Sequence, residues 1–109
     1  SIRELADDGK VPFVELLRGD ASFGWLMQQR GYSTVPSPEF PHAGGENYFN
    51  GGYNTRRYGL RKGGKISGFQ LECPRKTVRD TEKNRKTFAE AFAGALLEYM
   101  DLHHVLKID

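Results

Sequence analysis

The sequence predicts an α/β fold in which helices and strands pack around one core. Residues 22–35 have the pattern of a helix, a glycine and a short strand. Residues 66–73 alternate loosely between polar and apolar side chains, and residues 81–100 repeat apolar side chains at helical spacing. The 109 residues suffice for a single domain, or for the C-terminal part of one.

The N-terminal part contains two candidate strands and a helix. Residues 11–17 are expected to form a short strand, with Pro12 placing it at a sheet edge or at a strand start. A helix is the competing interpretation, because proline also fits a first helical turn. Ser22 is a good N-cap for a helix over residues 23–30, and Gly31 stands where a helix-ending glycine belongs. Tyr32–Val35 alternates as a short strand.

A long glycine- and proline-rich loop is expected over residues 36–65. Three prolines exclude regular structure from its start, and its aromatic side chains favour an ordered loop over a disordered one. The strand expected at Ile66–Cys73 ends at Pro74. Its alternation directs Phe69 and its neighbours at 71 and 73 toward the core, and it directs Gln70 and Glu72 to the opposite side.

The clearest helix is expected over residues 81–100. Asp80 or Thr81 caps its start, and Glu82 lies favourably in its first turn. The apolar stripe of this helix is interpreted as core packing, and the adjacent His103 and His104 as surface residues. The stripe comprises Phe88, Phe92, Ala95, Leu96 and Tyr99.

Composition narrows the function classes. The net charge of +2 is too balanced to indicate nucleic-acid binding, and no apolar run approaches the roughly 20 residues that span a bilayer. The single cysteine, Cys73, excludes an intrachain disulfide and leaves the redox compartment open. Because Ser1 is not a methionine, the chain is expected to be processed, tagged or cut from a longer one. Processing would fit a secreted protein, although the localisation stays unknown.

Residues 51–75 carry the candidate site. The glycine pair Gly51 and Gly52 allows backbone to approach a ligand closely, and the adjacent Arg56 and Arg57 offer donors to a carboxylate. Glu72, near the end of the apolar strand, is a candidate general base. Strand alternation would let only one of the two arginines face the site. The alternatives are a solvated strand edge for the arginines and a structural pair between Glu72 and a nearby arginine, Arg75 or Arg79.

These residues resemble the C-terminal half of the N-formylglutamate amidohydrolase family over roughly residues 20–100. The matching pieces are Ser22–Gly24, Leu26, Arg30–Gly31, Val35–Pro38, Tyr48–Gly59, Phe69–Arg75 and the closing helix. The resemblance implies the C-terminal portion of a three-layer, zinc exopeptidase-like mixed sheet with flanking helices. It also implies hydrolysis of a C–N amide bond of a small acidic N-acyl amino acid, such as N-formylglutamate.

The resemblance also implies a role for each matching residue. Glu72 corresponds to the glutamate that acts as general base and proton shuttle. An arginine grips the substrate carboxylate, and glycine backbone forms a close wall. The implied substrate-binding residues are Gly51, Gly52, Asn54, Thr55, Arg56 and Arg57.

The chain departs from the family in its metal ligands. A catalytic zinc takes about three protein ligands, and those of the family lie in its N-terminal half. His42, His103 and His104 form no ligand pattern. The chain is therefore expected to be the smaller product of a processed precursor, in a heterodimer with a second polypeptide that binds the zinc. The alternatives are a non-catalytic anion-binding or structural module and, less favoured, an RNA-binding domain.

Overall fold

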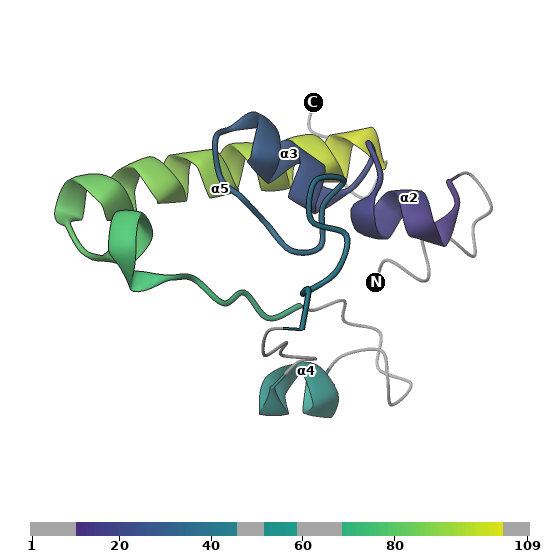
Figure 1. Ribbon diagram of the computed structural model, residues 1–109, viewed down its shortest axis with the longest axis horizontal. Helices are drawn as coiled ribbons and strands as arrows, with labels where there is room; N and C mark the ends of the chain where they lie inside the picture. The colour runs from purple at the N-terminus through teal and green to yellow at the C-terminus, as the bar shows by residue number, and fades with distance from the viewer. Residues whose placement is uncertain (1–10, 46–51, 59–68, 104–109) are drawn as a thin grey trace.

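The protein is helical in the parts that the structure, a computed structural model, describes: residues 11–45, 52–58 and 69–103. The long helix α5 packs against α3, and α2 lies beside α3 (Figure 1). The interrupted helical turn η2 leads into α5. The elements are α2 (Phe13–Arg18), α3 (Phe23–Gln29), α4 (Tyr53–Tyr58), η2 (Arg75–Arg79) and α5 (Glu82–Leu102). Within these ranges, no helix combines the length and apolar content needed to cross a membrane.

The predicted α/β fold with a mixed sheet is wrong, because no strand occurs in the described ranges. Tyr32–Val35 and residues 69–73 run as irregular segments, while residues 66–68 lie outside the described residues. Most of the run expected as a strand at residues 11–17 belongs instead to the helix α2, the competing interpretation, which buries Leu16. Alternation shows which side chains share a side, but a strand also requires a neighbouring strand to pair its backbone groups.

The predicted ends of α3 are confirmed. The Ser22 hydroxyl accepts a hydrogen bond from the backbone N–H of Trp25 at 3.1 Å, which satisfies a donor of the first turn. After the helix, Gly31 has a φ of +84°, which lies in the left-handed region that glycine adopts without strain. Local capping signals therefore position α3.

The helix predicted over residues 81–100 is observed as α5, from Glu82 to Leu102. Its N-cap is Thr81, whose hydroxyl accepts from the backbone N–H of Asn84 at 3.1 Å. At its other end, Nε2 of His103 donates to the carbonyl oxygen of Ala21 at 2.7 Å. His103 is partly buried and joins α5 to the turn before α3, so its interpretation as a surface residue is wrong.

The core lies between α3 and α5. Leu26 and Met27 of α3 and Ala95 of α5 are at most 4% exposed. Aromatic rings from both helices surround them, as the apolar stripe predicted. At the end of α3, Arg30 forms an ion pair with Glu98 at 2.6 Å. The surrounding aromatic residues are Phe23, Trp25, Tyr32, Phe88, Phe92 and Tyr99.

The proline-rich segment after α3 folds back onto that helix. The buried Ser37 donates its backbone N–H to the carbonyl oxygen of Phe40, and its hydroxyl accepts from the Phe40 backbone N–H, both at 3.0 Å. A Cβ at Gly24 would overlap the carbonyl oxygen of Pro36, so the two backbones are in close contact. The segment is thus an ordered turn, and α4 forms a short helix further along the predicted loop.

The turn before α5 depends on Asp80. Thr77 has a φ of +67°, which is rare for a β-branched residue, and its backbone N–H donates to the Asp80 carboxylate at 3.1 Å. The side-chain amide of Asn84 donates to the same carboxylate at 2.7 Å. The Asn84 bond, and next the Thr77 bond, hold the pKa of Asp80 below its ordinary value.

We expect this turn to weaken in acid. A carboxyl whose pKa is lowered by folding stabilises the fold above its unfolded pKa and loses that contribution as the pH falls through its folded pKa. The variant Asn84→Ala should raise the pKa of Asp80 toward its ordinary value, as measured by NMR titration of the Asp80 carboxyl carbon. Thr87→Ala, an exposed change on the same helix, is the control. An unchanged pKa of Asp80 in Asn84→Ala would refute the assignment.

Candidate functional site

The structure brings together two segments of the candidate site, the one around Gly52 and the one that carries Glu72. A Cβ at Gly52 would overlap the side-chain oxygen of Gln70 and lie 3.3 Å from its Cδ. The side-chain nitrogen of Gln70 in turn donates to the carboxylate of Glu72. Gly52 and Glu72 therefore lie on either side of one glutamine side chain, although they are 20 positions apart in the sequence. The missing side chain at Gly52 leaves room for the Gln70 amide, and a Cβ there would displace the end of this exposed side chain.

Gly52 also starts the helix that carries the arginines. Its carbonyl oxygen accepts from the backbone N–H of Arg56 at 3.2 Å and from the hydroxyl of Thr55 at 3.0 Å. The side chain of Asn54, in the same turn, is exposed. Gly51 lies outside the described residues. The predicted substrate-binding residues from 52 to 57 therefore form a single short helix beside Gln70.

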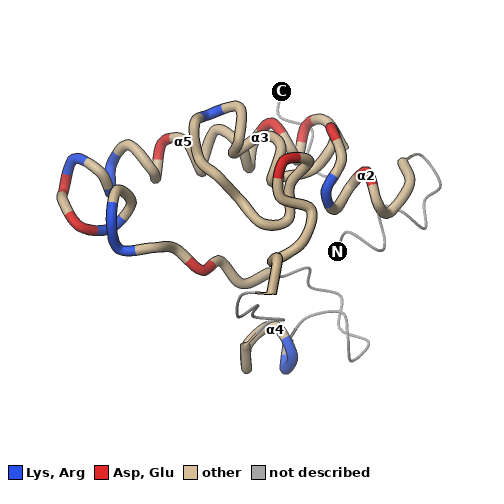
Figure 2. Tube along the Cα trace, in the orientation of Figure 1, with Lys and Arg blue, Asp and Glu red and all other residues tan. Residues whose placement is uncertain are grey.

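Arg56 and Arg57 lie in the last turn of α4, and both are exposed. The strand alternation predicted for them is wrong, because consecutive residues of a helix point about 100° apart rather than to opposite faces. In Figure 2 they form the blue turn of α4, on a helix with no acidic residue. The helix thus offers positive charge in two directions.

Glu72 lies on the segment of residues 69–74 that runs between α4 and the α3–α5 pair (Figure 1). Its side chain is exposed and accepts from Gln70. The structural pair with Arg75 or Arg79 is not formed, and the Nε of Arg79 donates instead to the carbonyl oxygen of Pro74 at 3.3 Å. The carboxylate of Glu72 is therefore held by a neutral amide and stays accessible from solvent.

Phe69 anchors this segment to the core. Its ring centroid lies 5.8 Å from that of Phe23 on α3 and 6.5 Å from that of Phe92 on α5. The ring is nevertheless 58% exposed, so it covers the edge of the core rather than filling it. The prediction that Phe69 and Leu71 point into the core holds only for the ring contacts of Phe69, because both side chains are exposed, Leu71 by 41%, and the segment forms no strand. This contact fixes the residue three positions before Glu72.

Cys73 follows Glu72 and is partly buried. Burial raises the pKa of its thiol, the charge of Glu72 raises it further, and the nearby Arg79 lowers it. A raised pKa leaves less of the reactive thiolate. These contributions agree with its predicted role as a small apolar residue and disfavour a nucleophilic one.

Among the residues that the structure describes, no group of three or more His, Cys, Asp or Glu side chains could hold a metal ion. His103 donates to Ala21, and His42 contacts Arg18. The described part of the chain does not fit a zinc site, which the resemblance assigns to residues outside this chain.

No protein-family model matches the chain, and neither curated proteins nor solved structures include a significant match.

Proposed function

We propose that this chain is part of a zinc-dependent amidohydrolase that cleaves the C–N amide bond of a small acidic N-acyl amino acid, such as N-formylglutamate. A second polypeptide would complete the active site as the larger chain of a processed heterodimer. The observation that carries the proposal is the contact series from Gly52 through Gln70 to Glu72. It joins a close backbone surface, a carboxylate and a helix with two arginines.

Each part has a role that follows from its chemistry. Arg56 or Arg57 would bind the substrate carboxylate, because a guanidinium presents paired donors to two carboxylate oxygens. Gly52 lets backbone approach the ligand. Glu72 would accept a proton from the attacking water and pass it to the leaving nitrogen, since a positioned carboxylate can act as both base and acid. Gln70 would orient that carboxylate through its hydrogen bond.

The metal belongs to the proposed partner polypeptide. Zinc lowers the pKa of a bound water to about 7 and polarises a carbonyl group, which is the activation that amide hydrolysis needs. Because the described residues offer no ligand set, the role proposed for this chain is limited to substrate binding and proton transfer. Mass spectrometry and metal analysis of natively purified protein test whether a second polypeptide supplies the zinc site. A second polypeptide with near-stoichiometric zinc supports this assignment, and a lone, metal-free species contradicts it.

The variant Glu72→Gln tests the chemical role. Glutamine keeps an oxygen that can accept from Gln70 but cannot take up a proton at neutral pH. We expect kcat for N-formylglutamate to fall by about 10²- to 10⁴-fold with little change in KM, measured on the natively purified protein. Glu90→Gln, an exposed change on α5, is the matched control. An unchanged kcat in Glu72→Gln would remove Glu72 from the mechanism.

Variants of Arg56 and Arg57 distinguish the two proposed functions, an enzyme and a non-catalytic anion-binding module. In an enzyme, Arg56→Ala or Arg57→Ala should raise KM for the acidic substrate. In a binding module, the same variants should weaken glutamate binding, measured by calorimetry, while no preparation shows turnover. Retained turnover and retained binding in both variants would exclude α4 from the site.

A further inference from the structure

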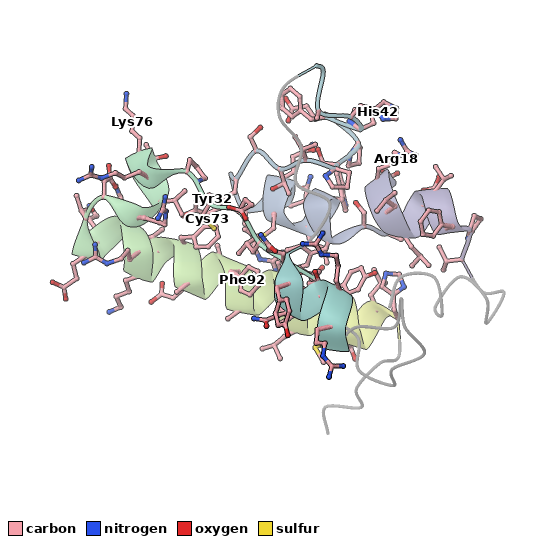
Figure 3. All side chains as sticks on the ribbon, turned by 90° about the horizontal axis from the view of Figure 1, so that it is seen from below. Arg18, Tyr32, His42, Cys73, Lys76 and Phe92 are labelled. Carbon is pink, nitrogen blue, oxygen red and sulfur yellow. The ribbon has the colours of Figure 1, made fainter. Side chains whose placement is uncertain are left out.

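A second cationic site lies at the end of α2, separate from Glu72 and Arg56. Nη1 of Arg18 lies 3.0 Å from Nδ1 and 3.1 Å from Nε2 of His42, and it donates to the carbonyl oxygen of Pro41 at 3.4 Å. Arg18 comes from the last turn of α2 and His42 from the proline-rich segment. Figure 3 shows the two labelled side chains beside each other.

The guanidinium of Arg18 has no carboxylate partner among the described residues. Its Nε is enclosed and makes no hydrogen bond, so this charged group is partly removed from water without full compensation. Partial removal from water strengthens the attraction of a charge for a counter-ion. Arginine remains charged at every physiological pH, so the guanidinium attracts an anion at every physiological pH.

His42 makes the arrangement more favourable for an anion. A neutral imidazole has one acceptor nitrogen and one N–H. Only one ring nitrogen of His42 can therefore accept a hydrogen bond from Arg18. The other ring nitrogen carries an N–H donor, which lies close to the positively charged guanidinium. The 3.0 Å contact leaves no space for an anion between the two groups, but an anion beside them in the hollow would accept from both. Arg18 has donors only, so the imidazole is the sole possible acceptor in this contact, and with an anion bound it no longer needs to accept from Arg18.

The two side chains line a hollow of about 320 Å³. This volume lies at the lower end of the range found for small-molecule sites, roughly 300–1,000 Å³. Among the residues that the structure describes, no aspartate or glutamate lines the hollow, and apart from Arg18 and His42 these lining residues are apolar. The apolar residues are Leu17, Val35, Pro36, Pro41 and Ala43.

We propose that this hollow binds a small organic carboxylate with a short apolar body. The carboxylate would lie against Arg18 and His42, and the carbon chain against the apolar walls. The apolar walls favour such a ligand over inorganic phosphate, which has no apolar part. The proposal is independent of the amidohydrolase function, because the site shares no residue with α4 or Glu72.

NMR titration of the full chain tests the proposal directly. The Nε–H of Arg18 is shielded from water, so its exchange should be slow enough for detection. Butyrate should shift this signal in a saturable manner with millimolar affinity. Acetate should bind more weakly, by about fourfold for each methylene that leaves the hollow, and inorganic phosphate more weakly still. Absence of a saturable shift would overturn the proposal, as would a phosphate affinity above that of butyrate.

Variants check that the site is the one described, and butyrate binding is followed in all of them through the backbone amide signal of Ala43, because the Arg18 variants lack the Nε–H signal. Arg18→Gln should abolish butyrate binding, and His42→Gln should weaken it several-fold. Lys83→Gln removes the same charge from an exposed position on α5 and should leave binding unchanged. If Arg18→Gln does not fold, Arg18→Lys replaces it, since lysine keeps the charge without the paired donors. Wild-type affinity in both His42→Gln and the folded Arg18 variant would refute the site.

Discussion

Replacing Gly24 with alanine is expected to destabilise the protein by about 3 kcal/mol, near the upper end of the usual cost of overpacking. The new Cβ would overlap the carbonyl oxygen of Pro36 and lie 2.9 Å from its carbonyl carbon and 3.1 Å from the Cα of Ser37. All three are backbone atoms, so no side-chain rotation relieves the clash. Either the first turn of α3 or the segment after it must move.

Gly94→Ala is the matched control, because it makes the same change inside a helix. There, the new Cβ would meet only the side chain of Arg30, at 3.3 Å from Nε, and that side chain can shift. Alanine favours helix by up to about 1 kcal/mol over glycine, so this control should be neutral or stabilising. Urea unfolding followed by fluorescence of Trp25, the single tryptophan, measures both variants. Equal stabilities for the two would contradict the close contact at Gly24.

Leu26→Ala should cost a similar amount, about 3 kcal/mol, by leaving a cavity in the core. The Leu26 side chain is only 4% exposed and belongs to the buried cluster with Met27 and Ala95. The surrounding rings come from α3, from Tyr32 after it and from α5, so the site cannot collapse without separating α3 from α5. This loss would be a large fraction of the stability of an ordinary domain, about 5–15 kcal/mol.

Leu97→Ala provides the comparison for Leu26. It deletes the same atoms from a side chain that is 51% exposed on α5, so it should cost less than about 1 kcal/mol. The same urea unfolding measurement applies. If Leu97→Ala destabilised the protein as much as Leu26→Ala, the exposed face of α5 would have to be buried against another molecule.

The sequence predicted those elements whose signals are local. Ser22, Gly31 and Thr81 mark helix ends through hydrogen bonds and backbone angles within a few residues, and the structure has each of these features. The strands were wrong because pairing depends on segments far away in the chain. At residues 11–17, Pro12 suited either structure, and only the burial of Leu16 in a helix decided between them.

The sequence predicted which residues belong to the candidate site, but it did not predict how these residues are arranged. The glycine of residue 52 and the carboxylate of Glu72 do lie near each other, yet the link between them is Gln70, to which no role had been assigned. The directions of Arg56 and Arg57 depended on a strand that is a helix. The Arg18–His42 contact spans 24 positions, and spacing alone gave no sign of it.

Phe69 belongs at once to the edge of the core and to the segment that carries Glu72. Under the proposed function, ligand binding and folding are therefore linked energetically at this ring. A ligand that holds residues 70–72 in place also holds the ring against α3 and α5, so it stabilises the helix pair by mass action. Conversely, loosening of the helix pair would release the ring, and the carboxylate would lose its fixed position even though every residue of the candidate site remained intact.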